Sequence, residues 1–156
     1  MTQEEKQLLL KDLSARLPYG VKGLAYIVGD PCLTNTNIVG IINESIVTDY
    51  ESPMLDLIDF NSKDIIIKPY LRPLSSMTEE EKKELKSEFC VDIRDEDNGR
   101  HTERYGYVIV YHNFKDESWY IPFEAIDWLN KHHFDYRGLI EKGLALPAPD
   151  GMYNTK

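Results

Sequence analysis

The spacing of apolar residues predicts an amphipathic helix at the start of the chain. Four leucines recur every three or four residues and so share one helical face: Leu9, Leu10, Leu13 and Leu17. Thr2 and Glu5 have the spacing of a capping box, in which each side chain satisfies a free backbone N–H of the first turn. Residues 18–20, Pro-Tyr-Gly, end the helix. We expect its apolar stripe to pack on a sheet.

Short runs of β-branched and aromatic residues predict strands after this helix. Residues 21–28 form one such run. Residues 37–50 fit two interpretations: two strands joined near Asn43, or one long bent strand with a bulge at Gly40.

The next apolar segments are harder to assign. Residues 52–60 fit either a short helix or another strand, and the period does not decide between them. Residues 64–74 predict an extended segment. Because Pro69 has no backbone donor, this strand lies at the edge of the sheet or leaves the sheet there.

A second capping box, Thr78 with Glu81, predicts a helix in the middle of the chain. Its apolar face is thin, consisting mainly of Leu85 and Phe89, so we expect this helix at the periphery of the domain. Residues 94–104 are polar and predict a loop.

The last third of the chain predicts a hairpin followed by two helices. Residues 105–114 alternate between apolar and polar, and 118–122 look like the returning strand. Pro122 suits the first turn of a helix over 123–133, and 135–144 predict a second short helix.

Strands that come in runs favour the α+β class. We expect a mainly antiparallel sheet of about five strands, with an N-terminal helix, a peripheral middle helix and a C-terminal helix pair. The length of 156 residues suits a single domain over 1–146, and the Pro/Gly-rich residues 147–156 predict an irregular tail.

Charge and composition narrow the possible partners. The chain carries 27 acidic and 18 basic side chains, a net charge of −9, so its average surface repels phosphate and disfavours nucleic acid as a partner. An acidic protein can also imitate DNA and so occupy a DNA-binding protein. This is a minor variant of binding to a protein partner, and it needs the acidic residues to line one elongated face. The two cysteines are isolated, and no apolar run approaches the ~18 residues of a membrane helix. We expect a cytoplasmic protein with a protein partner and no cofactor.

Two adjacent histidines, His132 and His133, are the most conspicuous candidate chemistry. Neighbouring residues of a helix diverge by about 100°, so these two imidazoles are poorly placed for one metal ion, and we expect no metal site. A structural interpretation is available. With Lys131 they put positive groups at the helix C-terminus, and Asp135 suits the N-cap of the next helix. The helical spacing points His133 inward.

A small enzyme remains the alternative. Its site would combine His112, on the predicted hairpin, with His133 and a carboxylate such as Asp135. The chain has no nucleophile elbow, phosphate loop or dinucleotide fingerprint. The acidic residues 92–103 lack the glycine position of a calcium loop.

Aromatic residues gather on the predicted hairpin and suggest an interface, because tyrosine and tryptophan are favoured anchors of protein contacts. They are Tyr105, Tyr107, Tyr111, Trp119 and Tyr120. The other interpretation is that these rings form the core and rim of the sheet.

Two stretches, IKPYLRPLSSMTEEEKKE (67–84) and WLNKHHFDYRGLIEKGLAL (128–146), resemble small proteins encoded in prophage and other mobile-element regions of gut Bacteroidales. The resemblance implies a bacterial or phage cytoplasmic setting and an accessory role, and it carries no assigned activity. Our hypothesis is therefore a non-enzymatic accessory protein that binds another macromolecule.

Overall fold

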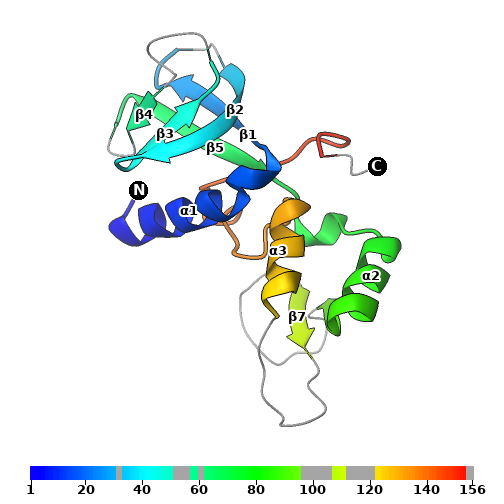
Figure 1. Ribbon diagram of the computed structural model, residues 1–156. Helices are drawn as coiled ribbons and strands as arrows, with labels where there is room; N and C mark the ends of the chain where they lie inside the picture. The colour runs from blue at the N-terminus through cyan, green and yellow to red at the C-terminus, as the bar shows by residue number, and fades with distance from the viewer. Residues whose placement is uncertain (31–32, 51–56, 60–61, 96–106, 112–121, 154–156) are drawn as a thin grey trace.

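The protein has an α+β fold (Figure 1). The computed structural model describes residues 1–30, 33–50, 57–59, 62–95, 107–111 and 122–153. In this part of the chain, three α helices accompany a six-stranded, mainly antiparallel sheet and a two-stranded sheet. The larger sheet and α1 form one half of the molecule, and α2, α3 and β7 lie in the other (Figure 1). The expected fold class is confirmed.

The N-terminal helix α1 (Gln3–Arg16) begins at the predicted capping box. The Glu5 N–H donates to the Thr2 hydroxyl (3.2 Å), and the Thr2 N–H donates to the Glu5 carboxylate (2.7 Å). Leu9 and Leu13 are buried against the sheet, as the apolar stripe predicts. A 3₁₀ turn, η1 (Leu17–Tyr19), then leads into the first strand.

The larger sheet is a meander whose fifth strand returns beside the first. Its strands are β1 (Val21–Ile27), β2 (Leu33–Ile42), β3 (Ser45–Thr48), β4 (Leu57–Asp59), β5 (Ile65–Leu71) and β8 (Leu146–Pro147). The spatial order is β4-β3-β2-β1-β5-β8, and only the β5–β8 pair is parallel.

Both interpretations of residues 37–50 hold in part. Two strands meet at a turn in which Asn43 and Glu44 have positive φ angles of 47° and 65°. The register also shifts between Ile38 and Gly40, as a bulge requires. Within the ambiguous segment 52–60, the described residues 57–59 are a strand.

The prediction for Pro69 is confirmed, because β5 has β1 on one side and only the two-residue β8 on the other. One hydrogen bond fixes which residues of β5 bond to β1: the Val28 N–H donates to the Asp64 C=O (2.7 Å), so residues 28 and 64 form a hydrogen-bonded pair. Hydrogen-bonded pairs alternate along an antiparallel ladder, so the even-numbered residues of β5 bond to β1 and the odd-numbered ones point outward. Pro69, which has no N–H, therefore occupies an outward position.

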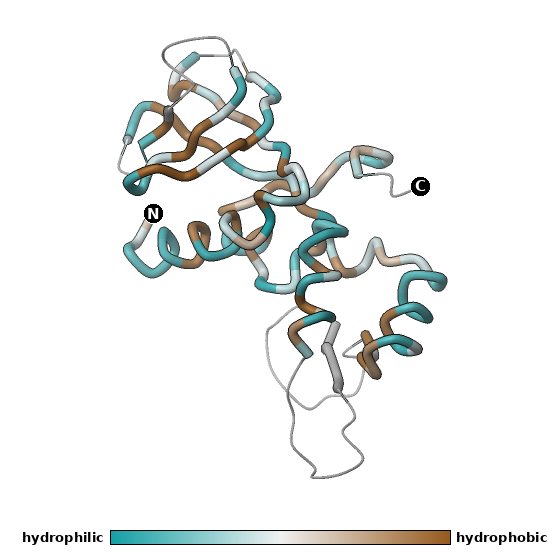
Figure 2. The backbone as a smooth tube through the Cα atoms, viewed as in Figure 1, coloured by the Kyte–Doolittle hydropathy of each residue, from teal (hydrophilic) through white to brown (hydrophobic). Residues whose placement is uncertain are grey.

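A second apolar cluster forms around the later elements η2 (Leu74–Ser76), α2 (Glu79–Phe89), β6 (Val91–Asp95), β7 (Tyr107–Tyr111) and α3 (Phe123–Lys131). The second capping box is present at the start of α2, and Leu85 is the buried residue of this helix. Figure 2 shows that α2 is mostly hydrophilic along its length, as expected for a peripheral helix.

The loop expected over residues 94–104 needs correction. Residues 94 and 95 belong to β6, which pairs with β7, so the polar stretch predicted as a loop begins inside a strand. Val91 and Ile93 are buried and alternate with the charged residues Asp92 and Arg94. This alternation is typical of a strand, but it is too short to be recognised in the sequence. The expected return strand 118–122 lies mostly outside the described residues.

The expected helix pair also needs correction, because only α3 is an α helix. Residues 135–144 form consecutive turns, and Gly138 and Gly143 take positive φ angles of 72° and 68° that interrupt helical geometry. Asp135 does cap this segment: its carboxylate accepts from the N–H groups of Leu139 and Ile140 (2.8 Å each).

The end of α2 gives a first testable prediction. Cys90 is an exposed residue at the helix C-cap with φ 57°, a left-handed conformation that costs an L-residue free energy. We expect Cys90→Gly to raise the free energy of unfolding by roughly 0.5–1 kcal/mol, because glycine adopts this conformation without a Cβ penalty. Urea denaturation measures the change. Cys90→Ala, which removes the thiol but keeps the Cβ, serves as the control, and equal stabilisation by both variants would contradict the explanation.

Candidate functional site

The histidine-containing segment 132–137 lies where the two apolar clusters meet. His132 caps α3, and His133 follows in a left-handed conformation with φ 58°. The chain then runs beside the end of β5: the Arg72 N–H donates to the His133 C=O (2.8 Å), and the Asp135 N–H donates to the Arg72 C=O (2.7 Å). Phe134 is fully buried in the second cluster. The segment thus connects α3 to the larger sheet.

A buried ion pair fixes this segment to α1. Arg16 and Asp12 are both fully buried and are one helical turn apart. Two guanidinium nitrogens of Arg16 bond to the Asp12 carboxylate (2.7 and 3.0 Å), and Nη2 also donates to the Phe134 C=O (2.7 Å). Arg137 reaches the same carboxylate at 3.2 Å. Nη1 of Arg16 has no hydrogen-bond partner among the described residues.

His133 is buried and neutral. Burial, and next the positive charge of Arg16, lower the pKa of its imidazole to about 4. Nε2 lies 3.2 Å from the Tyr19 C=O and must carry the proton to donate to it, which leaves Nδ1 as an acceptor without a partner in the described chain. The ring stacks on Tyr153 with centroids 3.8 Å apart.

This finding corrects the expectation that both histidines bring positive charge to the end of α3. His133 does point inward, as the spacing predicts, but through its left-handed backbone and as a neutral group. His132 is also buried; its Nδ1 lies 2.8 Å from the Trp128 C=O, and its ring stacks on Trp128 at 3.9 Å. It thus satisfies a carbonyl of the last helical turn.

The C-terminal tail is anchored through Tyr153. The Lys22 N–H donates to the Tyr153 hydroxyl (3.0 Å), and that hydroxyl donates to the Tyr70 C=O (3.0 Å). The hydroxyl therefore extends the β1–β5 ladder by one rung beyond the Gly23–Pro69 pair. Burial raises the pKa of Tyr153 to about 12, so it keeps the proton that this bridge needs. Of the tail expected over residues 147–156, the described part begins in β8 at Pro147, continues in turns and bends, and is docked through Tyr153.

The structure does not pair His133 with Asp135. Both Asp135 oxygens accept backbone N–H groups, and His133 contacts Tyr19 and Tyr153 instead. His112 lies outside the described residues, as do Tyr105, Trp119 and Tyr120. Tyr107 and Tyr111 belong to β7, for which only the backbone is described. In the described part of the chain, no three His, Cys, Asp or Glu side chains are placed to hold a metal ion.

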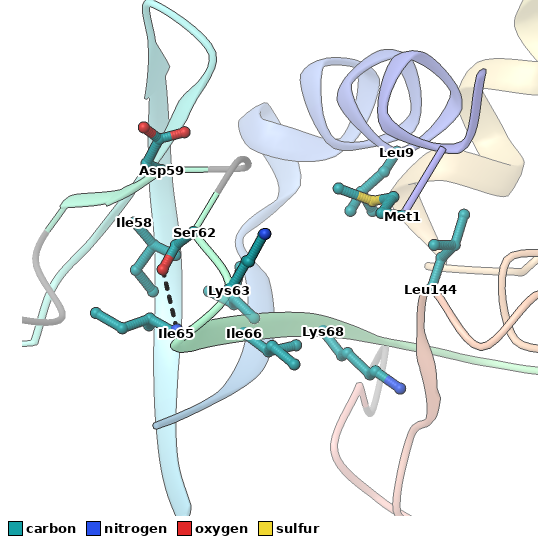
Figure 3. Close-up of a pocket in the computed structure, with 11 residues that line it drawn as sticks. Met1, Leu9, Ile58, Asp59, Ser62, Lys63, Ile65, Ile66, Lys68 and Leu144 are labelled. Carbon is teal, nitrogen blue, oxygen red and sulfur yellow. Dashed lines mark hydrogen bonds between the residues drawn. The ribbon is translucent and has the colours of Figure 1, made fainter. Parts of the chain in front are cut away.

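A groove of about 490 Å³ opens elsewhere, between α1, the end of β4 and the outer edge of β5. Apolar side chains form its walls: Met1, Leu9, Ile58, Ile65, Ile67 and Leu144. In Figure 3, Leu9 and Met1 project from the N-terminal region toward Ile58 and Ile65 on the opposite side. We call this feature the β5 groove.

Polar groups at the β5 groove are few. The Ser62 hydroxyl accepts from the Ile65 N–H (3.0 Å), the hydrogen bond drawn in Figure 3. Lys63 is exposed and Lys68 half-buried, and within the described chain neither has an ion pair. Asp59 lies at the far end. Sequence reasoning missed this groove, although lysines that flank three isoleucines before Pro69 were a usable signal.

A second hollow, of about 550 Å³, lies between the start of α2 and the tail. It is mainly polar, and its Arg72 is already held by both oxygens of Glu81 (2.7 and 2.9 Å). Arg72 also lies over the Phe134 ring at 4.1 Å. This hollow therefore belongs to the internal network of the segment 132–137.

Comparisons with protein-family models, with curated proteins and with solved structures gave no match. Among the described helices, none is long and apolar enough to cross a membrane.

The buried state of His133 makes stability depend on pH. The folded-state pKa of about 4 lies below the unfolded value of 6.5, so the unfolded chain binds the proton first. The contribution of neutral His133 is complete above pH 6.5 and is lost as the pH falls toward 4. From pH 7 to pH 5 we expect this group to lower the free energy of unfolding by roughly 2 kcal/mol. Urea denaturation at both pH values gives the change.

His133→Asn is the matched variant for that experiment, because asparagine tolerates the left-handed conformation at this position. It should lose less stability between the two pH values than the parent protein. An identical pH dependence in both proteins would assign the effect to other groups.

The buried ion pair gives another prediction. Asp12→Ala leaves the Arg16 guanidinium buried without its carboxylate, which should lower the free energy of unfolding by about 3–5 kcal/mol. Glu79→Ala, which breaks the exposed Lys82–Glu79 pair, should cost less than about 1 kcal/mol. Urea denaturation measures the free energy of unfolding of both variants. Equal decreases would show that the buried ion pair stabilises the fold no more than the exposed one does.

Proposed function

We propose that this chain is a non-enzymatic accessory protein of a mobile element, works in the cytoplasm, and binds a protein partner through the β5 groove. The resemblance of residues 67–84 and 128–146 to prophage-encoded proteins supports the setting. The observation that carries the binding role is an apolar groove beside an open strand edge.

The polar chemistry of segment 132–137 supports binding over catalysis. His133, Asp135 and Arg16 hold the fold together through internal contacts, and the first two are the candidate catalytic residues that the structure describes. A group used in this way is not poised to meet a substrate.

The β5 groove has the properties of a recognition surface. Its walls are apolar, and an outward strand edge can receive backbone hydrogen bonds from an added segment. Figure 3 shows the Lys63 side chain extending from the β4–β5 connection over the groove. The positive charge of Lys63 at the rim can orient a bound partner, and the side chain leaves the groove itself unfilled.

Site-specific photo-cross-linking tests the proposal. A photoreactive residue at position 63 reports on the rim of the groove, and one at Lys11 reports on an exposed position on the side of α1 opposite to Leu9. In cells that carry the element, we expect position 63 to give a discrete protein adduct, identified by mass spectrometry, and position 11 to give none. Equal adducts at both positions, or none at position 63, would contradict binding through the groove.

A further inference from the structure

We infer that the β5 groove recognises an extended segment with the alternating pattern aliphatic–acidic–aliphatic, which adds as a short strand beside β5. This inference rests on the proposed function, since it specifies the chemistry of the partner at the same groove.

The backbone of β5 presents a short open edge. Ile65, Ile67 and Pro69 point their backbone groups away from β1. The Ser62 hydroxyl takes the Ile65 N–H, and Pro69 has no N–H, so the Ile67 amide is the outward donor. From Tyr70 onward β8 pairs with β5. An added segment can therefore bond over about three residues, and its side chains must supply most of the affinity.

Side chains of a strand alternate between its two faces. On the inner face of the β5 edge, an added segment would cover mainly the exposed Met1 and the half-buried Ile65, which lie over the buried core residues Leu9, Ile58 and Leu144. Residues one and three of the segment would point there, so both need aliphatic side chains. A polar group at either position would be buried in the groove without a hydrogen-bond partner.

The middle residue would point to the outer face, beside Lys68. The Lys68 side chain is half-buried on this face, where it neighbours Ile66 and Leu24. A carboxylate there meets an ammonium group that has no ion pair among the described residues. Lys63 adds a second positive charge at the rim. Although the chain carries −9 overall, Lys63 and Lys68 outnumber Asp59 among the charged side chains that line this groove, which favours an acidic residue beside Lys68.

Peptide titrations followed by NMR of the ¹⁵N-labelled full chain test the pattern. A peptide with Val-Glu-Val at its centre should shift the amide signals of residues 65–68 and slow hydrogen exchange at Ile67. The permuted peptide Glu-Val-Val has the same composition but sends its acid toward the apolar wall, so we expect it to bind at least about tenfold more weakly, which is about 1.4 kcal/mol.

A charge swap tests the role of Lys68. Lys68→Glu should weaken Val-Glu-Val and strengthen Val-Lys-Val, whereas Lys11→Glu, the same charge change on the far side of α1, should leave both affinities as they are. Circular dichroism of each variant checks that it is folded. A Lys68→Glu protein that keeps its preference for the acidic peptide would overturn the assignment of Lys68.

Three outcomes separate this inference from the proposed function. Equal binding of the two permuted peptides at residues 65–68 overturns the pattern and leaves the groove as a protein-binding site. Peptides that bind without shifting these amides overturn both. Octanoate that shifts the same amides as strongly as the peptides makes the groove a small-molecule site and also overturns both.

Discussion

The fold depends on how the buried Arg16 guanidinium is satisfied. A fully buried charge is tolerated only with a counterion and hydrogen-bond acceptors, and Arg16 finds these in Asp12 and the Phe134 carbonyl. The first partner lies on the same helix, and the second is 118 residues away in the chain. One side chain thus fixes where α1 lies relative to the segment that follows α3. Because α1 packs on the larger sheet and Phe134 belongs to the second cluster, this contact also sets how the two apolar clusters adjoin.

The same constraint explains why the most reactive-looking stretch of the sequence has a structural role. His133 lies close enough to Arg16 that the guanidinium charge helps to keep the imidazole neutral, and its ring packs on Tyr153. Tyr153 in turn inserts its hydroxyl between β1 and β5. The chain from Arg16 to His133 to Tyr153 joins the N-terminal helix, the end of α3 and the tail around one end of β5.

The features that could be predicted from the sequence depend on residues that lie close together along the chain. Both capping boxes need only residues three apart, and Pro69 carries its own edge-strand signal. The features that sequence missed depend on distant partners. Asp12 and Arg16 have the spacing of an ordinary surface ion pair, and their burial depends on distant partners, the Phe134 carbonyl for Arg16 and Arg137 for Asp12. Likewise, residues 135–144 have helical periodicity, yet Asp135 and two glycines of positive φ select turns. The β5 groove combines residues from α1, β4, β5 and the segment before β8, so no local pattern could place it.

The outer edge of β5 is the part of the larger sheet to which the proposed partner would bind. Open edges invite unwanted pairing, and proteins usually protect them. Here most of the edge is protected: Ser62 takes the Ile65 N–H, Pro69 offers no donor, and β8 covers the strand from Tyr70 onward. The Ile67 N–H is the outward donor that remains, although the residue as a whole is only 7% exposed, and it lies where the wall is apolar and the rim carries Lys63 and Lys68. Ser62 and β8 therefore limit an added strand to the short stretch around Ile67, where apolar walls and two lysines lie side by side, and this limit is the physical basis of the partner chemistry proposed above.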